Sequence, residues 1–365
     1  MPFIFLVWSC SGPGRDAPST PGEAAVSVEA AVFPVLVGPY LGQPPALSEP
    51  VVFAPGIVST GFAERDVAMM PDGSEIYWGV TGNNYIWSTV LFSRLVDGRW
   101  TEPEAAPCCL DPGFTDLEPH ITPDGRRFLW LSDRPGPGRA SKGGQDIWAM
   151  DRDDDGWGAP YPLPEVINSS GSEYFPSVTR DGTLYFTRSP AGGGENRIWR
   201  SRLVDGEYQD PEELPPEVNA GLSRYNAFVD PDEGYLILGI VGMDDSLGGT
   251  DYYIVFRNDR DEWSDPVNLG PLVNTPGGLE YSPYVSPDGE YFFFMTARPA
   301  WDRLAPDGTW DGRRLRSFAA DANNGASDIY WMDAAFLDAL RPVSYTHLTL
   351  PTTRQRCRSR WSPYQ

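Results

Sequence analysis

The chain has 365 residues, enough for one large domain or two ordinary ones, and 41% of them are hydrophobic, which is sufficient for a sizeable core. Its 38 glycines and 37 prolines favour many turns and short strands over long helices. The formal net charge of −23 argues against nucleic acid and anionic membrane surfaces as partners.

Residues 1–25 are predicted to form a signal-like segment followed by a tether. Residues 3–8 are an apolar run, and Ser9-Cys10-Ser11-Gly12 after it resembles the end of a bacterial lipoprotein signal with Cys10 as the acylated residue. The pattern is imperfect, because Trp8 replaces the usual small residue and no basic residue precedes the run. An ordinary secretory signal or a different start is the alternative. Residues 11–25 are rich in Gly, Pro, Ser and Ala, as flexible tethers are.

Residues 26–342 are predicted to form a single domain built from five similar units. Each unit has an acidic residue, a short apolar stretch, a tight turn and an aromatic run. The turns are Pro71-Asp72-Gly73, Pro123-Asp124-Gly125, Arg180-Asp181-Gly182, Pro231-Asp232-Glu233-Gly234 and Pro287-Asp288-Gly289. Their aspartates are 52, 57, 51 and 56 residues apart, and a period of this size indicates a repeat architecture.

Each unit is predicted to contain four short antiparallel strands, so the fold is expected to be an all-β, five-bladed β-propeller. In the last unit residues 280–286, 291–295 and 328–331 supply three strands, but no fourth strand follows. Residues 49–60 align instead with the fourth strand of the preceding unit, at residues 265–275. The N-terminal segment should therefore complete the last blade and close the ring. A propeller with a sixth, irregular blade is the alternative.

Over residues 49–333 the repeats resemble the WD40-like (PD40, TolB-type) propeller family of bacterial envelope proteins. The motif that carries the resemblance is [YF]-x-P-x-[VI]-[ST]-P-D-G, and residues 119–125 and 283–289 match it best, whereas residues 231–234 depart from it. The resemblance implies a periplasmic or cell-surface propeller that contacts a protein or glycan, and it implies no catalytic residues. We expect a monomer that meets a membrane only through a lipid on Cys10.

The repeats also place charged residues at equivalent positions. Eight residues before the turn aspartates the sequence has four acids and one arginine: Glu64, Asp116, Glu173, Arg224 and Glu280. Asp66 and Glu118, two residues further on, should share the same strand side. These residues are predicted to surround one mouth of the central channel and to bind a ligand such as a cation or polyol. The alternative is structural, and each acid would then pair with the backbone or an arginine of a neighbouring blade.

An acid ring also leaves a second function open. Glycoside hydrolysis requires two well-placed carboxyl groups, so a pair among these acids could make the protein a glycan-active hydrolase. A catalytic triad is a weaker hypothesis, because His120 is the sole histidine of the domain and no nucleophile motif accompanies it.

The segment 298–327 is predicted to be a long loop at the same mouth. Its basic and aromatic residues would suit a lid, or half of a site for sugars or carboxylates, and they include Trp301, Arg303, Trp310, Arg313 and Arg314. A loop that is simply held on the acidic surface is the alternative. Arg134 and Arg298 are expected to pair with Asp146 and Asp328 across such loops.

No cofactor or metal is expected. Residues 151–156 begin like a calcium loop, but Pro162 occupies the position of the bidentate glutamate, so a plain Asp-Gly hairpin turn is favoured and calcium is the weaker alternative. The absence of a Cys/His cluster excludes a structural zinc site. Cys108 and Cys109 are adjacent, and two thiols are favoured over a vicinal disulfide.

Residues 343–365 contain four arginines and no acid, and residues 343–353 resemble the translation of a sequencing adapter. We therefore expect this tail to be foreign to the domain. On that view His347 and Cys357 carry no function.

Overall fold

The computed structural model describes residues 32–82, 85–136, 144–154, 156–304 and 308–341. The chain divides into two compact units, Met1–Pro34 and Val35–Gln365, and the fold described below belongs to the second. Cys10 and the tail from residue 343 lie outside the described residues, so the predictions for them are untested. No described helix combines the length and apolar character needed to cross a membrane.

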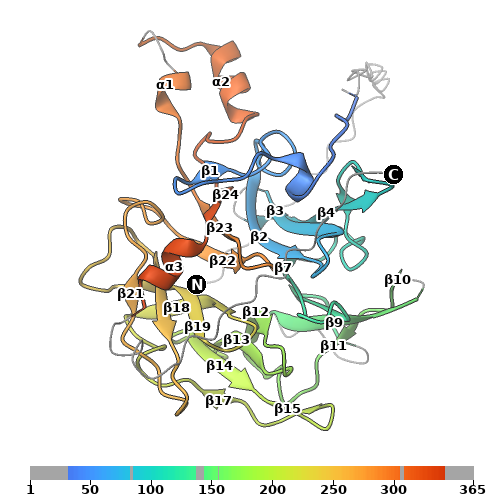
Figure 1. The fold of residues 1–365 in the computed structure, drawn as a ribbon, viewed down its shortest axis with the longest axis vertical. Coiled ribbons are helices and arrows are strands. Elements are labelled where there is room, and N and C mark those ends of the chain that lie inside the picture. The colour runs from blue at the N-terminus through green and yellow to red at the C-terminus, as the bar shows by residue number, and fades with distance from the viewer. Residues whose placement is uncertain (1–31, 83–84, 137–143, 155, 305–307, 342–365) are drawn as a thin grey trace, which may run out of the picture. The chain divides into compact units, whose positions relative to one another are not determined.

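Five small antiparallel sheets are arranged in a ring, which confirms the predicted five-bladed propeller (Figure 1). From the inside outward, blade 1 is β2 (Ala63–Met69), β3 (Glu75–Thr81), β4 (Ser88–Val96) and β5 (Arg99–Trp100), with β6 (Glu104–Ala105) also on β4. Blade 2 is β7 (Asp116–Ile121), β8 (Arg127–Ser132), β9 (Asp146–Asp153) and β10 (Gly156–Trp157), with β11 (Tyr161–Pro162) also on β9.

Blades 3 and 4 repeat this order. Blade 3 is β12 (Ser172–Val178), β13 (Leu184–Ser189), β14 (Arg197–Ser201) and β17 (Glu212–Glu213), and the hairpin β15 (Leu203–Val204) and β16 (Glu207–Tyr208) extends from it. Blade 4 is β18 (Ser223–Val229), β19 (Tyr235–Val241), β20 (Asp251–Phe256) and β21 (Val267–Asn268). The innermost strands of neighbouring blades contact one another all the way around, so they surround a central axis.

The fifth blade is closed by the N-terminal segment, as the sequence predicts. It contains β22 (Tyr281–Val285), β23 (Tyr291–Thr296) and β24 (Asp328–Asp333), and β1 (Val51–Val52) pairs with β24. Val51 lies opposite Trp331 in this register. Phe53, which is fully buried, follows directly and packs edge-on against Phe293 and Trp331, with ring centroids 5.1 and 5.2 Å away. The closing strand is therefore anchored by side-chain packing as well as by its ladder.

The turn aspartates fix the inner hairpins. In blade 1 Asp72 accepts a hydrogen bond from the backbone N–H of Ser74 at 2.9 Å, and Gly73 adopts a φ of +73° that favours glycine. In blade 4 Glu233 stands where the other turns have glycine, and it takes the left-handed conformation with a φ of 60°. The turn of the most divergent repeat therefore keeps its shape at the cost of a less favourable residue.

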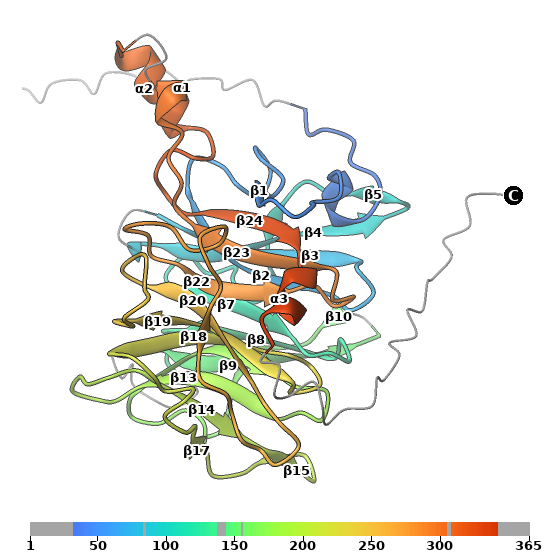
Figure 2. The same ribbon diagram turned by 60° about the vertical axis from the view of Figure 1, so that its left-hand side comes forward.

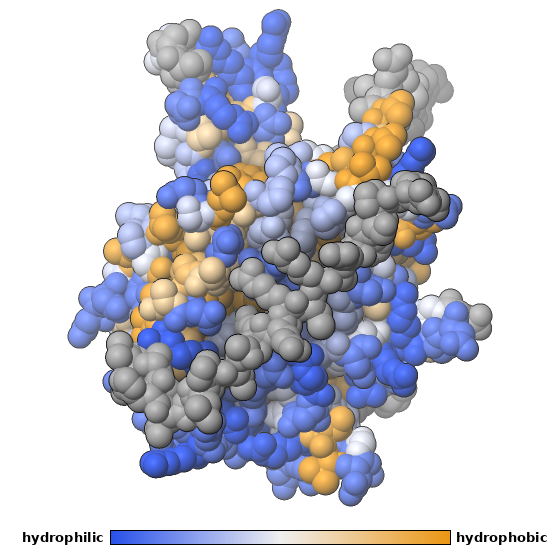
Figure 3. Space-filling view, in the orientation of Figure 1, coloured by the Kyte–Doolittle hydropathy of each residue, from blue (hydrophilic) through white to orange (hydrophobic). Residues whose placement is uncertain are grey.

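The segment 298–327 is not a structureless loop. It contains α1 (Trp301–Leu304) and α2 (Gly312–Ala319), and Asp311 caps α2 by accepting hydrogen bonds from the backbone N–H groups of Arg313 and Arg314. This helical hairpin extends from the ends of β23 and β24 (Figures 1 and 2). The remaining helices are η1 (Tyr40–Gly42) and α3 (Ala335–Ala339). On the face shown in Figure 3 the described surface is mostly hydrophilic, in keeping with the net charge.

Candidate functional site

Each innermost strand contains a bulge at the same repeat position. The residue six before the turn aspartate has a left-handed backbone in all five blades, with φ between 50° and 69°: Asp66, Glu118, Phe175, Asn226 and Ser282. The strand register shifts at this point in every blade. Left-handed φ is uncommon for residues other than glycine, and a bulge commonly re-aims a side chain. The fivefold recurrence indicates that this bulge shapes the centre of the ring.

A cavity of about 470 Å³ lies over the bulges. Inner strands of all five blades contribute to it, so it surrounds the propeller axis. Its walls are mainly polar and aromatic: Arg65, Tyr85, Thr115, Leu117, Glu118, Leu131, Gln145, Tyr174, Asn196, Tyr225, Asn226 and Tyr281. The volume falls in the range of small-molecule sites.

A buried ionic cluster forms one part of the cavity. Arg65 lies 2.6 Å from Glu118, at Nη2 and Oε1, and its Nε is 2.8 Å from an Asp66 oxygen. Glu118 also accepts hydrogen bonds from the backbone N–H of Phe175 at 2.7 Å and from Asn226 at 3.2 Å. Burial raises the pKa of Glu118 to about 7, although Arg65 opposes this rise.

Tyrosines form another part of the cavity wall. Tyr281 and Tyr85 share a hydrogen bond between their hydroxyl groups at 2.5 Å, and the Arg65 guanidinium lies 4.7 Å from the Tyr281 ring centroid. Tyr225 packs edge-on against Tyr281 at 5.7 Å. The cavity therefore combines aromatic surfaces with hydroxyl and amide groups, while its single arginine is already neutralised by two carboxylates.

The five residues eight before the turn aspartates are not among those that line this cavity. Glu64 accepts a hydrogen bond from Thr60. Asp116 binds Arg134 and Trp130, and Glu173 binds Arg188 and Ser169. Glu280 accepts from Thr275 and Thr296. Each acid is thus held by groups of its own blade or of the connection before it, and not by a neighbouring blade as the structural alternative supposes.

Burial affects these acids differently. It raises the pKa of Glu64 to about 7 and raises the pKa values of Asp116 and Glu280 above the usual range. Arg224, the exception in the column, donates to the carbonyl groups of Ala220, Gly221 and Asn196. Arg224 also pairs with Glu195 at 3.2 Å, so this position remains satisfied with inverted charge.

Asp66 and Glu118 do lie at the axis, although Glu64 and Asp116 do not. The expected alternation, in which residues two apart share a strand side, is interrupted by the left-handed residue at each bulge. Of the seven predicted ring residues, the structure therefore brings two together around Arg65 and leaves five in separate pockets. Their role in ligand binding stays a prediction.

His120 is a buried, hydrogen-bonded residue of the structural core. It lines a second space on the axis, about 10 Å³ in volume and too small for anything larger than a water molecule. Its Nε2 accepts a hydrogen bond from the backbone N–H of Val178 at 3.0 Å, and burial lowers its pKa to about 3. The imidazole is therefore neutral and already engaged, which does not favour a role as a general base.

Residues of the predicted lid lie on the helical hairpin. Trp301 and Trp310 are exposed, and Arg303 pairs with Asp321 at 2.9 Å. Arg313 and Arg314 lie in the first turn of α2. None of these residues lines the cavity as the structure describes it.

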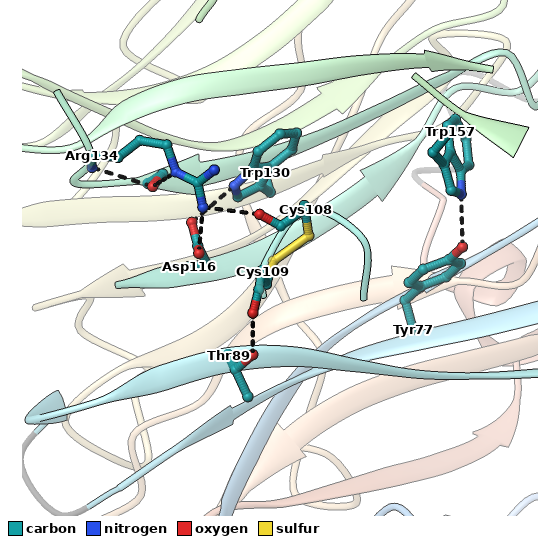
Figure 4. Close-up of a disulfide and its surroundings, with 9 residues drawn as sticks. Tyr77, Thr89, Cys108, Cys109, Asp116, Trp130, Arg134 and Trp157 are labelled. Carbon is teal, nitrogen blue, oxygen red and sulfur yellow. Dashed lines mark hydrogen bonds and ion pairs between the residues drawn. A yellow bond between two sulfur atoms is a disulfide. The ribbon is translucent and has the colours of Figure 1, made fainter. Parts of the chain in front are cut away.

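Two loop-closing ion pairs differ from expectation. Arg134 pairs with Asp116, and Arg298 donates to the carbonyl groups of Leu272 and Val273 at 2.7 and 2.9 Å. Arg134 also donates to the carbonyl group of Cys108 (Figure 4). The arginines therefore bind the connection that precedes their blade, since its carbonyl groups need donors.

Cys108 and Cys109 are joined in a vicinal disulfide, so the preference for two thiols is wrong. Both residues are buried. Figure 4 shows the pair between Arg134 and Thr89, whose hydroxyl group donates to the Cys109 carbonyl.

Among the residues that the structure describes, no group of three or more His, Cys, Asp or Glu side chains could hold a metal ion. In the calcium-like segment Asp155 lies outside the described residues, and Asp151 is bound by Arg127 and Tyr161.

One further repeat position in the sequence identifies residues that line the cavity. Counting seven residues back from the turn aspartates gives Arg65, Leu117, Tyr174, Tyr225 and Tyr281, and every one of them lines the cavity. Tyr85 has no such signal, because it lies in an irregular connection between β3 and β4.

No protein-family model matches this sequence, and neither does any curated protein. Solved β-propeller structures do resemble the fold. TolB from Acinetobacter baumannii has a TM-score of 0.43 and 15% identity, over 75% of this chain and 55% of that chain. A thermostable family-43 glycoside hydrolase has a TM-score of 0.43 and 13% identity, over 65% and 84%. The periplasmic gluconolactonase PpgL from Pseudomonas aeruginosa has a TM-score of 0.38 and 12% identity, over 64% of each chain.

This similarity concerns the fold alone. The chain spans about half the length of the TolB structure that it resembles. Membership of the PD40 repeat family stays a prediction from the motifs.

Proposed function

We propose that this protein is an extracytoplasmic binding module, which takes part of a protein or glycan ligand into the cavity over its axis. The observation that carries the proposal is the cavity itself, about 470 Å³ in volume, polar and aromatic, and lined by all five blades. A periplasmic or surface location is part of the proposal. The proposed location rests on the signal-like segment at residues 1–25 and on the resemblance of the repeats to the TolB-type propeller family.

The lining favours a neutral, polar ligand. Arg65 is offset by Asp66 and Glu118, so its charge is not available to a ligand without disrupting two ion pairs. The hydroxyl groups of Tyr85 and Tyr281 bond to each other and that of Tyr225 bonds to Thr250, but each hydroxyl oxygen can take part in a further hydrogen bond. A ligand with several hydroxyl or amide groups would match them.

Glycan hydrolysis is the second candidate, and one observation favours it. Glu118 lines the cavity with a pKa of about 7, as a general acid requires at neutral pH. Against it, Arg65, Asn226 and the Phe175 N–H already occupy the Glu118 oxygens. A carboxyl group held so firmly is better suited to shaping the cavity than to transferring protons.

One experiment separates these possibilities. Wild-type protein is tested for binding and turnover on a panel of glycans and of soluble envelope proteins, alongside Tyr225→Ala and Glu118→Gln. Glu75→Gln serves as the matched control, because its carboxyl group is held by Arg152 at the turn end of blade 1 and lies outside the cavity lining. Circular dichroism verifies that each variant is folded.

Binding without turnover that is lost in Tyr225→Ala and retained in Glu75→Gln is the expected result. Turnover that disappears in Glu118→Gln would establish the hydrolase instead. Binding unaffected by Tyr225→Ala would place the ligand elsewhere and overturn the proposal. So would the absence of any binding across the panel.

A further inference from the structure

The exposed aromatic residues of this protein are concentrated in one sector beside the cavity. Among the residues that the structure describes, five aromatic side chains are exposed: Phe62, Tyr85, Trp87, Trp301 and Trp310. All belong to the connection before β2, the connection between β3 and β4, or the helical hairpin. Aromatic rings elsewhere in the described chain are buried or half-buried. A concentration of exposed apolar groups marks a contact surface more often than isolated residues do.

The first part of this surface is continuous with the cavity wall. Tyr85 belongs to the wall and is 46% exposed, and its hydroxyl group is bonded to that of Tyr281. Trp87, two residues on, is 41% exposed. Its indole packs on Gly82, where an added Cβ atom would lie 2.2 Å from the indole nitrogen. Glycine at position 82 therefore lets the indole lie flat against the backbone.

Phe62 extends the surface away from the cavity. Its ring packs edge-on against Trp87, with centroids 5.6 Å apart, and it is 54% exposed. The neighbouring Gly61 contacts the end of α2, since an added Cβ atom there would lie 2.4 Å from the Ala319 carbonyl oxygen. Asn324 donates to the Gly61 carbonyl group at 3.1 Å. The connection before β2 and the hairpin thus form one surface.

The hairpin supplies the outer end. Phe318, near the end of α2, stacks on Trp301 of α1 at 6.3 Å and 19°. Trp301 is 64% exposed. We call the exposed rings of this series, from the cavity outward, the aromatic track: Tyr85, Trp87, Phe62 and Trp301.

We propose that the aromatic track binds successive sugar rings of a neutral oligosaccharide, whose terminal ring occupies the cavity. This inference rests on the proposed function and names the ligand class for it. The C–H face of a sugar ring packs on an aromatic ring, while its hydroxyl groups bond to water or to polar side chains. An exposed row of aromatic residues leading from a pocket rich in hydroxyl and amide groups meets both needs.

A peptide fits this surface less well. Peptide recognition commonly uses a free strand edge, an apolar groove or the capture of a charged terminus. The track lies on irregular connections and short helices, so it offers no strand edge for pairing. At the cavity end Arg65 is held by Asp66 and Glu118, and it is not free to bind a terminal carboxylate.

The test is the dependence of affinity on oligosaccharide length. Gluco-, xylo-, manno- and N-acetylglucosamine oligosaccharides of one to six residues are titrated by calorimetry against the full chain. We expect affinity to rise about tenfold for each of the first rings engaged on the track, as one good aromatic contact supplies. Trp87→Ala and Phe62→Ala should remove this rise and leave the affinity for the shortest ligand within about twofold.

Val204→Ala is the matched control, because Val204 is an exposed apolar residue on the distant β15–β16 hairpin. It should preserve the length dependence. Binding that does not vary with length, or a length dependence that Trp87→Ala leaves intact, would overturn the track while the cavity proposal stands. Peptide or protein binding lost in Tyr225→Ala, with no glycan bound, would do the same. No binding of any ligand at the cavity would overturn both.

Discussion

The imidazole Nε2 of His120 accepts a hydrogen bond from the backbone N–H of Val178, which belongs to the next blade. The same repeat position makes the same contact elsewhere: the Ser177 hydroxyl accepts from Val229 and the Tyr284 hydroxyl from Met69, at 2.9 and 3.1 Å. Three chemically different side chains thus link neighbouring blades at one level of the ring. The sole histidine of the domain is one of these links, which accounts for its burial without any catalytic role.

This contact predicts how stability depends on acidity. The pKa of His120 is about 3 in the folded protein against an ordinary value of 6.5, so between these values the unfolded chain binds one proton more. Stability therefore falls as the pH is lowered from about 6.5, by up to about 1.4 kcal/mol per pH unit from this group.

His120→Gln preserves an acceptor and removes the titration. Urea unfolding of both proteins between pH 7 and pH 5 should show wild type losing stability relative to the variant. Because other groups titrate equally in both proteins, the difference isolates His120. A constant difference across this range would show that His120 is readily protonated in the fold.

Arg65 is predicted to be the side chain whose loss most disturbs the centre. Its side chain is 7% exposed and holds both Asp66 and Glu118. Arg65→Gln leaves two buried carboxylates without their counter-charge, and breaking a buried pair in this way costs about 3–5 kcal/mol. Arg94→Gln is the control, because the Arg94–Glu104 pair is about half exposed. Its loss should lower the free energy of unfolding by about 0–1 kcal/mol. Chemical denaturation measures both, and equal effects would contradict the prediction.

The closing strand offers a prediction about the whole ring. Phe53 is fully buried between Phe293 and Trp331, so Phe53→Ala should lower the free energy of unfolding by about 3–5 kcal/mol. Val51 is 47% exposed in the same strand pair, and Val51→Ala should change it by no more than about 0.5 kcal/mol. Thermal and urea unfolding provide the measurement. A small effect of Phe53→Ala would indicate that the ring is held closed mainly by other contacts.

These examples show what could be read from the sequence. The Pro-Asp-Gly turns and aromatic runs predicted the blades, and the match of residues 49–60 to a fourth strand predicted the closure through Val51 and Val52. Both signals are local or repeated, so the sequence contains them in full.

The candidate site was harder to predict, because its geometry depends on the bulges. A left-handed Asp66 or Glu118 cannot be inferred from residue type, and it separates Glu64 from Asp66 although period-two alternation would align them. Tyr85 and the helices of the hairpin reach their positions through tertiary contacts, such as that between Gly61 and Ala319, that no periodicity reports.

The vicinal disulfide leads to a chemical prediction. After denaturation without reductant, alkylation should leave Cys108 and Cys109 unmodified, because their sulfurs are bonded to each other. Prior reduction should add two alkyl groups to the peptide that contains them, as mass spectrometry would show. Alkylation of both residues without reduction would mean that the pair is present as thiols.

Glu64 gives the opposite dependence on acidity from His120. Burial raises its folded pKa to about 7, with the nearby Asp328 adding to the rise, whereas the ordinary value is 4.5. Between these values the folded protein binds the extra proton, so stability falls as the pH rises from about 4.5 to 7. Glu64→Gln stays neutral and can still accept the hydrogen bond from Thr60.

Relative to wild type, Glu64→Gln should therefore gain stability between pH 5 and pH 8, by an amount on the order of 1–3 kcal/mol. Urea unfolding at both values gives the comparison, and Glu290→Gln, at an exposed glutamate, should show no such trend. If Glu64→Gln shows no gain in stability, like Glu290→Gln, then a partner must stabilise the Glu64 carboxylate. A cation between Glu64 and Asp328 would be the first partner to test. If the gain is present, the buried Glu64 carboxyl group destabilises the folded protein at neutral pH.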